Sequence, residues 1–294
     1  MEFLKRFDTL GLIIILSLVV LDGFFWFTIF RESAAVRGTR DYFLDVGQGD
    51  GELMVFEGNI KVMTDAGPDN KVVASLGKVM PAGDRYIDVA IISHPQLDHF
   101  NGYAYLLDAG YQFGVFIYNG RDDGPGVKAW PQLLQKIKEK NDPLLTLAAS
   151  DSIRSGDNKI AFLSPDKDFA LSAELNDTAF MELVTTPDFR TLLTADTGMN
   201  VEDFLIAHGT DMRADVLKVG HHGSKYSSGE AFLRAVNPKV AVVEVGAKNT
   251  YGHPSKAALA RIASSTRALI FRTDKNGIVE VFSENGKLRI IKER

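Results

Sequence analysis

The chain has 294 residues, of which 45% are hydrophobic and 24% are charged, so it can bury the core of a globular protein. Its net charge of −5 excludes a general attraction to nucleic acid, and its one local basic cluster is the C-terminal KLRIIKER. The lack of cysteine excludes disulfides, thiolate metal ligands and cysteine nucleophiles, so any metal site must use nitrogen and oxygen ligands.

The first predicted element is the apolar segment of residues 11–30, about 20 residues or about 30 Å as a helix, which matches the hydrocarbon core of a bilayer. We interpret it as one membrane helix, because its apolar side chains outweigh the cost of Asp22, about 2.5–3.5 kcal/mol. A cleaved signal peptide is the alternative, since Ser33, Ala34 and Ala35 are small, although such segments usually have ~7–15 apolar residues. Basic residues on both sides leave the orientation undecided.

Behind a polar linker, residues 31–40, the chain carries many short apolar runs typical of β-strands. In chain order these runs are YFLDV, ELMVF, IKVMT, VAIIS, GVFIY, KIAFL, FMELV, TLLTA, DVLKV, VAVVEV, ALIFR and IVEVF. The strands come in blocks with helices between them, which predicts packed sheets covered by helices in a layered α/β or α+β domain. We expect this domain to occupy residues 41–294, and residues 1–40 to be anchor and linker.

Helical patterns are fewer than strand patterns. Apolar residues repeat at helical spacing over residues 130–137, Ser227 and Glu230 form a capping box, and a further helix is predicted to start at Ser255. These segments supply the helices of the layered domain.

Side chains with metal-binding chemistry follow one apolar run, IDVAII. The stretch SHPQLDHFNG places His94, Asp98 and His99 directly behind it. Imidazole and carboxylate are ligands that zinc and manganese accept. Taken alone, the stretch also fits a turn in which Asp98 caps a helix and the histidines lie on the surface.

Three further motifs repeat this placement. LLTADTG ends a strand at Asp196, VLKVGHHGS ends one at His221 and His222, and KNTYGHPS places His253 behind VAVVEV. A turn cap, hydrogen-bond donors and a residue preceding a helix are the ordinary alternatives. Five of the six histidines nevertheless follow apolar runs, which favours one shared site, and the sixth, His208, is predicted to lie on the surface.

Together these motifs resemble the metallo-β-lactamase superfamily, and within it the extracytoplasmic hydrolase domain of ComEC-type competence proteins. The resemblance covers about residues 43–278 and rests, in the family's order, on LDVGQGDG, TDAG, SHPQLDHFNG, NDTAF, LLTADTG, DVLKVGHHGSKYSS, NTYGHP and TDKNG. It implies a four-layer αββα sandwich with a metal site along one edge of the two sheets, here joined to one N-terminal transmembrane helix.

The resemblance also implies roles for individual residues. The implied metal ligands are His94, Asp98, His99, Asp196 and either His222 or His253. The resemblance further implies that Asp65 orients the ligand loop, and we also predict supporting roles for Asp45 and Gln96. We predict Ser224 and Lys225, which lie beside these motifs, as substrate contacts.

Two departures from the family pattern bear on the metal. Gln96 stands where the superfamily has a second histidine and the competence proteins often have aspartate, so we predict one tightly held zinc or manganese ion, with a second bound weakly or not at all. The midchain histidine of many members is missing, and Asn176 and Asp177 of NDTAF either replace it or form a turn.

A metal bound by these ligands lowers the pKa of its water toward ~7 and so favours hydrolysis. We predict that Asp98 accepts the water proton and that His221 or His222 protonates the leaving oxygen. Lys218, like Lys225 and Lys248, is a candidate for contacting a phosphate, although an ordinary surface position is the alternative.

The function predicted from these features is a membrane-anchored, metal-dependent phosphodiesterase or nuclease. The alternatives are a hydrolase of a small ester, lactone or lactam, and a catalytically weak binding domain in which Gln96 has cost activity. The expected partners are nucleic acid or another phosphodiester, the membrane, and a separate channel protein, because one span cannot form a channel. We expect a single-pass protein of the cell membrane with its hydrolase domain outside the cytoplasm.

Overall fold

The computed structural model describes residues 9–33, 38–122 and 128–294. These residues divide into two compact units. One unit carries helix α1 (Thr9–Ser33), and the other carries residues 38–56 and 60–294.

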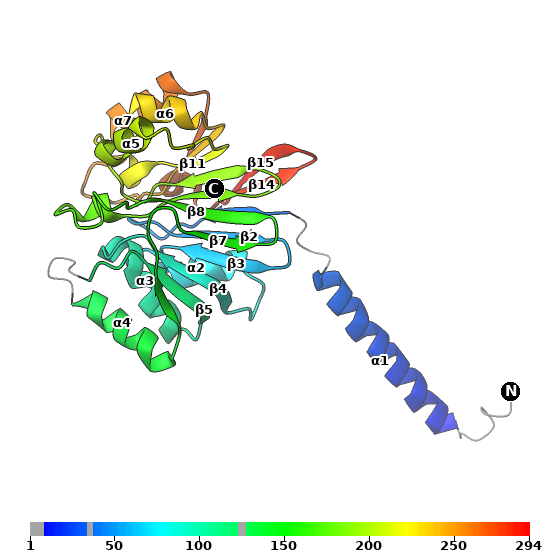
Figure 1. Cartoon of the computed structure of the whole chain (residues 1–294). Helices are drawn as coiled ribbons and strands as arrows, with labels where there is room; N and C mark the ends of the chain where they lie inside the picture. The colour runs from blue at the N-terminus through cyan, green and yellow to red at the C-terminus, as the bar shows by residue number, and fades with distance from the viewer. Residues whose placement is uncertain (1–8, 34–37, 123–127) are drawn as a thin grey trace. The chain divides into compact units, whose positions relative to one another are not determined.

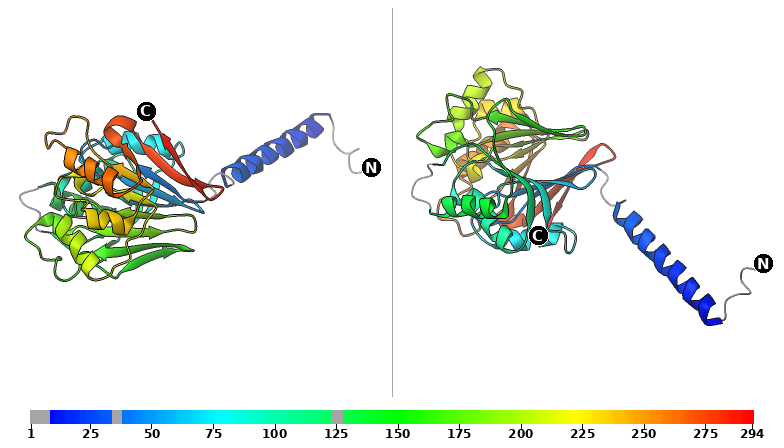
Figure 2. Two further views of the ribbon diagram at one scale, coloured as in Figure 1. Left: turned by 90° about the horizontal axis from the view of Figure 1, so that it is seen from above. Right: turned by 60° about the horizontal axis from the view of Figure 1, so that its bottom comes forward.

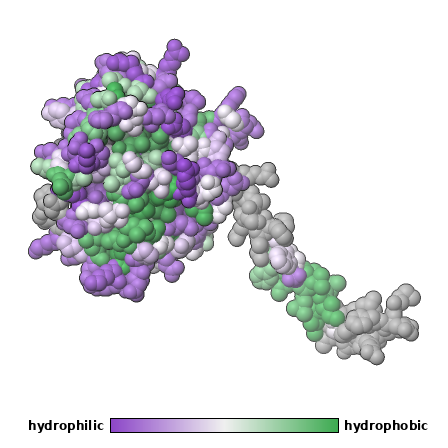
Figure 3. All heavy atoms as spheres, in the orientation of Figure 1, coloured by the Kyte–Doolittle hydropathy of each residue, from purple (hydrophilic) through white to green (hydrophobic). Residues whose placement is uncertain are grey.

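Helix α1 forms where the sequence predicts a helix (Figure 1). Its described apolar side chains are exposed, with Leu16 at 70% and Phe24 at 60%, and Figure 3 shows them as a hydrophobic surface. In the described part of the chain, however, no helix has both the length and the apolar character that crossing a membrane requires. The structure therefore does not confirm the transmembrane helix predicted for residues 11–30.

The larger unit is built on two β-sheets (Figures 1 and 2). Among the described residues, the first sheet has eight strands in the order β15-β14-β1-β2-β3-β4-β5-β6. Their bounds are β1 Arg40–Phe43, β2 Glu52–Phe56, β3 Ile60–Thr64, β4 Tyr86–Ile92, β5 Gln112–Tyr118, β6 Leu144–Thr146, β14 Val279–Glu284 and β15 Lys287–Lys292. Strands β3 to β6 run parallel, and the other neighbours pair antiparallel.

The second sheet has seven described strands in the order β13-β12-β11-β10-β9-β8-β7. Their bounds are β7 Ser152–Ser155, β8 Asn158–Ser164, β9 Met181–Thr185, β10 Arg190–Leu193, β11 Val216–Lys218, β12 Val240–Val243 and β13 Leu269–Arg272. Strands β10 to β13 run parallel, while β7 to β10 pair antiparallel. Each of the apolar runs identified in the sequence overlaps one strand of the two sheets.

Helices cover the outer faces of both sheets (Figure 1). The first sheet carries α2 (Lys71–Val79), α3 (Leu97–Asp108) and α4 (Ala129–Lys140), and the second carries α5 (Met199–Ala207), α6 (Glu230–Val236) and α7 (Lys256–Ser265). Shorter helical turns are η2 (Leu175–Thr178), η3 (Gly220–Gly223) and α8 (Thr273–Asn276). The layers therefore follow the order helix, sheet, sheet, helix, as the resemblance implied.

The helix predictions were right in position but wrong in one detail. Helix α7 is capped by Ser255, whose hydroxyl accepts the amide of Ala258 at 3.1 Å. The capping box predicted at Ser227 is absent, because Gly229 is the N-cap of α6 and the hydroxyl of Ser227 donates to the carbonyl of Gly220. The carboxylate of Glu202 accepts the Gly229 amide instead.

Aromatic and aliphatic side chains fill the space between the two sheets. The rings of Phe162 on β8 and Phe180 beside β9 lie 4.6 Å apart, and both are buried. Replacing Phe162 by alanine is expected to lower the free energy of unfolding by about 3–5 kcal/mol, because the cavity left behind cannot close completely. Urea unfolding measures the loss. Leu171→Ala, at a side chain 87% exposed, is the control and should leave the midpoint unchanged.

The parallel strands place several connecting loops at one edge of the sandwich. Asp65 follows β3, His94 lies two residues after β4, and Asp196 and His222 follow β10 and β11. Loops at the carboxyl ends of parallel strands are where such folds collect functional side chains. The candidate site is built there.

Candidate metal centre

Four side chains converge at this edge, and we call them the ligand tetrad: Asp98, His99, Asp196 and His222. Each offers one nitrogen or oxygen atom, and these four atoms all lie within 4.8 Å of one another. Asp98 and His99 come from the first turn of α3 beside the first sheet. Asp196 and His222 come from loops behind strands of the second sheet. Each half of the sandwich therefore supplies two members.

The four side chains of the tetrad face one another. The Nε2 atom of His99 lies 3.4 Å from Asp196, and that of His222 lies 3.4 Å from Asp98 and 3.5 Å from Asp196. Among the described residues, the Nε2 atoms of His99 and His222 and the Oδ1 atom of Asp196 are buried without a hydrogen-bond partner. Buried polar atoms without partners are costly, and converging nitrogen and oxygen donors suit zinc, manganese or iron. The residues present therefore fit a divalent metal.

The outer nitrogen of each tetrad histidine is held by a buried carboxylate. The Nδ1 atom of His99 lies 2.7 Å from Asp65, which also accepts the amide and hydroxyl of Ser93. The Nδ1 atom of His222 lies 3.1 Å from Asp50 and 2.9 Å from the carbonyl of Glu244. Such contacts fix the ring orientation and leave Nε2 aimed at the tetrad. The role of Asp65 was expected, but that of Asp50 was missed.

His94 is placed beside the tetrad rather than within it. Its ring centroid lies 4.2 Å from that of His99, and its buried Nε2 atom also has no hydrogen-bond partner in the described residues. Burial and the neighbouring His99 lower the pKa of His94 to about 4, so its imidazole is neutral at pH 7. A neutral imidazole can serve as a ligand.

His221 and His253 line the outer side of the site. The Nε2 atom of His221 lies 3.5 Å from Asp196, and its side chain is 32% exposed. The ring of His253 lies 5.7 Å from that of His221, and Asn249 hydrogen-bonds both its amide and its carbonyl. The sequence left His222 and His253 as alternatives, and the geometry places His222 in the tetrad.

Four other residues with predicted roles have different surroundings. Asp45 pairs with Arg294 at 2.6 Å, and the amide of Gln96 donates to Asn176. The hydroxyl of Ser224 accepts the amide of Tyr226, and the ammonium of Lys225 lies 4.8 Å from the Tyr226 ring. None of these described contacts reaches the ligand tetrad.

The NDTAF segment forms the turn η2 and supplies no tetrad ligand in the described structure. Asp177 accepts hydrogen bonds from Ser172 and Asn200. The amide of Asn176 lies 3.4 Å from His221, besides accepting from Gln96. Gln96 and Asn176 thus hold each other in place beside His221.

Lys218 is not a substrate contact, which corrects the expectation from the sequence. Its side chain is completely buried, forms an ion pair with Asp50 and donates to the carbonyl of Ala195 at 2.9 Å. An ammonium group enclosed in this way cannot meet a phosphate in solution. Asp50 is the one acidic residue of the glycine-rich segment GQGDG, and this placement was the signal in the sequence that could have indicated its role.

The backbone at the site is strained. His221 has φ 47° and ψ 51°, and His222 has φ 52° and ψ 25°. Asp65 and Ala195 also have positive φ, at 56° and 43°. Non-glycine residues in this region cost about 1–3 kcal/mol each and concentrate at functional sites. The strain therefore marks the same loops as the ligand tetrad.

The tetrad without metal holds protons on its histidines. Burial lowers the pKa of His222, but the carboxylates of Asp196 and Asp50 outweigh this and raise it to about 10. Burial likewise lowers the pKa of His99, and Asp196 and Asp65 raise it well above its usual value. Burial raises the pKa of Asp196, while His222 and His99 hold it well below its usual range. The carboxylates are therefore ionised.

Comparison with solved structures identifies the fold as that of the metallo-β-lactamases. YhfI of Bacillus subtilis, a metallo-β-lactamase fold protein, superposes with a TM-score of 0.55 at 12% identity, covering 82% of this chain and 99% of YhfI. Zinc-bound PqqB of Methylobacterium extorquens gives 0.51 at 13% identity, covering 76% and 85%. No family model matches the chain.

In sequence, the chain is similar to competence proteins. It is 26% identical over 259 residues to ComE operon protein 3 of Bacillus subtilis, covering 82% of this chain and 33% of the relative. It is 28% identical over 242 residues to competence protein ComA of Neisseria gonorrhoeae, covering 80% and 31%. The chain spans about a third of the length of these curated relatives. The likeness to the metallo-β-lactamase fold in structure, and to competence proteins of the ComEC type in sequence, is thus confirmed.

Proposed function

We propose that this protein is a metal-dependent hydrolase of phosphodiester bonds, and specifically a nuclease. The observation that carries the proposal is the ligand tetrad with its unpartnered inner atoms. A divalent zinc or manganese ion bound there would supply an acidified water and would polarise an oxygen of the phosphoryl group whose phosphorus is attacked. Asp98, His99, Asp196 and His222 would hold it, with His94 beside them.

The chain's own side chains supply the proton transfers in this proposal. Asp98 is the partly exposed member of the tetrad, with 27% of its side chain accessible, so it can accept a proton from water. Both ring nitrogens of His222 face other groups, Nδ1 facing Asp50 and Nε2 facing the tetrad. His221 is partly exposed and lies beside Asp196. Of the two histidines considered as proton donors, we therefore propose His221 as the one that protonates a leaving oxygen.

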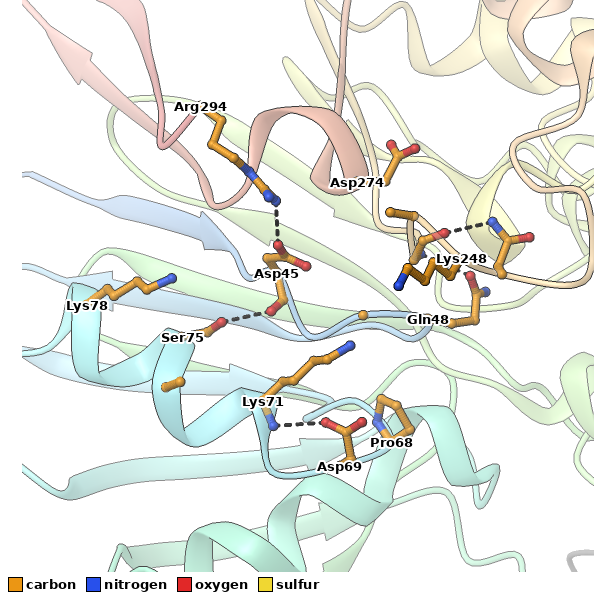
Figure 4. Close-up of a pocket in the computed structure, with 15 residues that line it drawn as sticks. Asp45, Gln48, Pro68, Asp69, Lys71, Ser75, Lys78, Lys248, Asp274 and Arg294 are labelled. Carbon is orange, nitrogen blue, oxygen red and sulfur yellow. Dashed lines mark hydrogen bonds and ion pairs between the residues drawn. The ribbon is translucent and has the colours of Figure 1, made fainter.

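A cavity lined in part by the loop that precedes Asp50 supports the binding of an anionic substrate (Figure 4). It measures about 640 Å³ and its wall includes Gln48, two residues before Asp50, and Asn249, which holds His253. Lys71 and Lys248 also line it, and among the described residues neither ammonium has an ion-pair partner. Two lysines without counter-ions attract the phosphates of a strand that passes the metal centre.

The acidic residues of this cavity are largely neutralised. Asp45 pairs with Arg294 and Asp274 pairs with Arg272, whereas Lys78 pairs with Glu293. One more carboxylate, that of Asp69, accepts the amide of Lys71. The two unpaired ammonium groups therefore outnumber the carboxylates that lack a cationic partner in the described lining.

Replacing both Lys71 and Lys248 by methionine is expected to weaken single-stranded DNA binding about tenfold near physiological salt. The dependence of log K on log salt should also become shallower by about 1.4, since each phosphate contact on a single strand contributes about 0.7. Fluorescence anisotropy with the Asp196→Ala background avoids cleavage during the titration. Lys138→Met with Lys140→Met, two exposed lysines of α4, is the matched control. An equal salt dependence of binding in the two double variants would exclude the cavity as a contact for the DNA strand.

In this proposal the number of tightly bound metal ions depends on whether Gln96 supplies a ligand. Its side-chain amide is engaged by Asn176, so it does not add a ligand to the four of the tetrad. We therefore propose one tightly held ion, zinc or manganese, with any second ion bound weakly. Two equivalents of metal retained through dialysis would contradict this.

Metal analysis of the purified protein, coupled to cleavage assays, tests the function. Single-stranded DNA and a chromogenic phosphodiester should both be hydrolysed, and a chelator should stop both reactions. Hydrolysis of a small ester, lactone or lactam without cleavage of either phosphodiester would favour the alternative substrate class. A protein that holds metal and cleaves none of them would be the catalytically weak binding domain.

We also propose that α1 attaches the protein to the cell membrane as a single-pass anchor, with the hydrolase domain, residues 41–294, outside the cytoplasm and beside a separate channel protein. The exposed apolar side chains of α1, among them Leu16 and Phe24, support attachment. Protease added to intact spheroplasts should digest the domain. Digestion only after lysis would place it in the cytoplasm.

A further inference from the structure

Lys218 occupies an unusual position for a lysine. It is the last residue of β11 and is completely buried, four residues before His222. Its ammonium pairs with Asp50, which lies between β1 and β2 of the first sheet, and donates to the carbonyl of Ala195 behind β10 of the second sheet. One cation therefore ties together loops from both sheets.

These two partners of Lys218 reach all four tetrad residues. One oxygen of Asp50 lies 3.1 Å from Nδ1 of His222, and the other lies 3.6 Å from Nδ1 of His99. The amide of Asp50 donates to the carbonyl of Asp98 at 3.2 Å. Ala195, held by the same ammonium, directly precedes Asp196. Displacing Lys218 would thus disturb the backbone or side chain next to every ligand.

The charges around Lys218 explain why the ion pair can persist in the interior. Burial raises the pKa of Asp50, but Lys218 and His222 hold it below its usual range, so the carboxylate is ionised. Behind the pair, burial and Glu244 raise the pKa of Glu52 well above its usual value, and burial and Asp50 raise that of Glu244 to about 8. Asp50 is therefore the anion that Lys218 neutralises, because buried charges persist only when paired.

We infer that Lys218 is a positioning residue for the metal: by fixing Asp50 and the Ala195 carbonyl, it sets the orientation of His222 and Asp196 and so the affinity of the tetrad for a divalent ion. The inference rests on the proposed metal site, but not on the substrate. Lys218 contacts neither the tetrad atoms nor solvent.

Three variants of the full chain separate this role from a purely structural one: Lys218→Met, Asp50→Asn and the two combined. Zinc affinity is measured by competition with a chromogenic chelator, and stability by urea unfolding of the metal-free protein. Lys218→Met should lose stability, because Asp50 stays buried and unpaired, and should bind zinc about 10–100-fold more weakly. Asp50→Asn should also lose stability and zinc affinity, because the ammonium of Lys218 is then buried without a counter-ion.

The double variant is the decisive one. It removes both charges, so it should regain much of the stability that either single variant lost. Its zinc affinity should nevertheless stay at least about tenfold below that of the wild type, because no ammonium then fixes the Ala195 carbonyl beside Asp196 and His222 faces a neutral amide that no cation holds in place. Regained stability together with wild-type zinc affinity would overturn the inference.

Asp41→Asn is the matched control. Asp41 is also a buried carboxylate between the sheets, but it hydrogen-bonds Thr191 and has no described contact with the tetrad. This variant should change stability without changing zinc affinity. Since the readout is metal binding, a wild-type protein that binds zinc but cleaves no phosphodiester refutes the proposed function alone. A wild-type protein that binds no divalent metal refutes both.

Discussion

Replacing Asp196 or His99 by alanine is expected to lower metal-dependent hydrolysis more than about 100-fold. Loss of residues that only support a metal ligand typically costs about 10–100-fold, so loss of a ligand itself should cost more. Asp196 lies within 3.5 Å of three histidine nitrogens, those of His99, His221 and His222, so its carboxylate is central to the site. Both variants should also lose bound metal.

The measurements are initial rates on a chromogenic phosphodiester, metal content after dialysis, and circular dichroism to verify the fold. The fold should survive because Asp196 lies on a loop and His99 in the first turn of a helix. His208→Ala is the control. Its ring lies exposed at the end of α5 and hydrogen-bonds only the Phe204 carbonyl among described residues, so activity should be unchanged. Full activity and full metal content in both ligand variants would remove the tetrad as the active site.

Metal affinity is expected to rise steeply with pH, by up to about 100-fold per pH unit between pH 6 and 8. The pKa of His222 is about 10 and that of His99 is also well above its usual value, so both imidazoles are protonated in this range without metal. A metal must displace one proton from each, and every displaced proton contributes about a tenfold change per pH unit. His94, with a pKa of about 4, releases none.

Calorimetry in two buffers of different ionisation enthalpy counts the protons released, and two are expected per ion. The same pKa shift predicts the behaviour of the metal-free protein. Because the pKa of His222 is raised on folding, its stabilising contribution is present below about pH 6.5 and is lost as the pH rises through about 10. Affinity independent of pH from 6 to 8 would mean that the metal does not bind through these imidazoles.

The site could be predicted from sequence as far as its signals were local. Asp98, His99, Asp196 and His222 each follow an apolar run, and the ends of such runs are where strands end and loops begin. The strands that the sequence missed are β6, β7 and β15, which have three, four and six residues and are largely exposed, so their patterns are weaker than those of the buried strands.

The errors arose where the partner is distant in the chain. Lys218 looks like a surface lysine because its partner Asp50 lies 168 positions away. The capping box predicted at Ser227 is absent because the carboxylate of Glu202, 27 positions before Gly229, accepts the Gly229 amide at the start of α6. The choice between His222 and His253 depended on the left-handed backbone at His222, which no local residue preference indicates.

The division of the tetrad between the two halves of the sandwich has a mechanical consequence. Two ligands belong to the first sheet's side and two to the second, so an ion at the tetrad is a cross-link that joins segments remote in the chain. Any motion that parts the sheets at this edge also pulls the ligand pairs apart. Metal release and opening of the sandwich should therefore be one event. At a free metal concentration 1,000 times Kd, the ion would add about 4 kcal/mol to the stability of the closed sandwich.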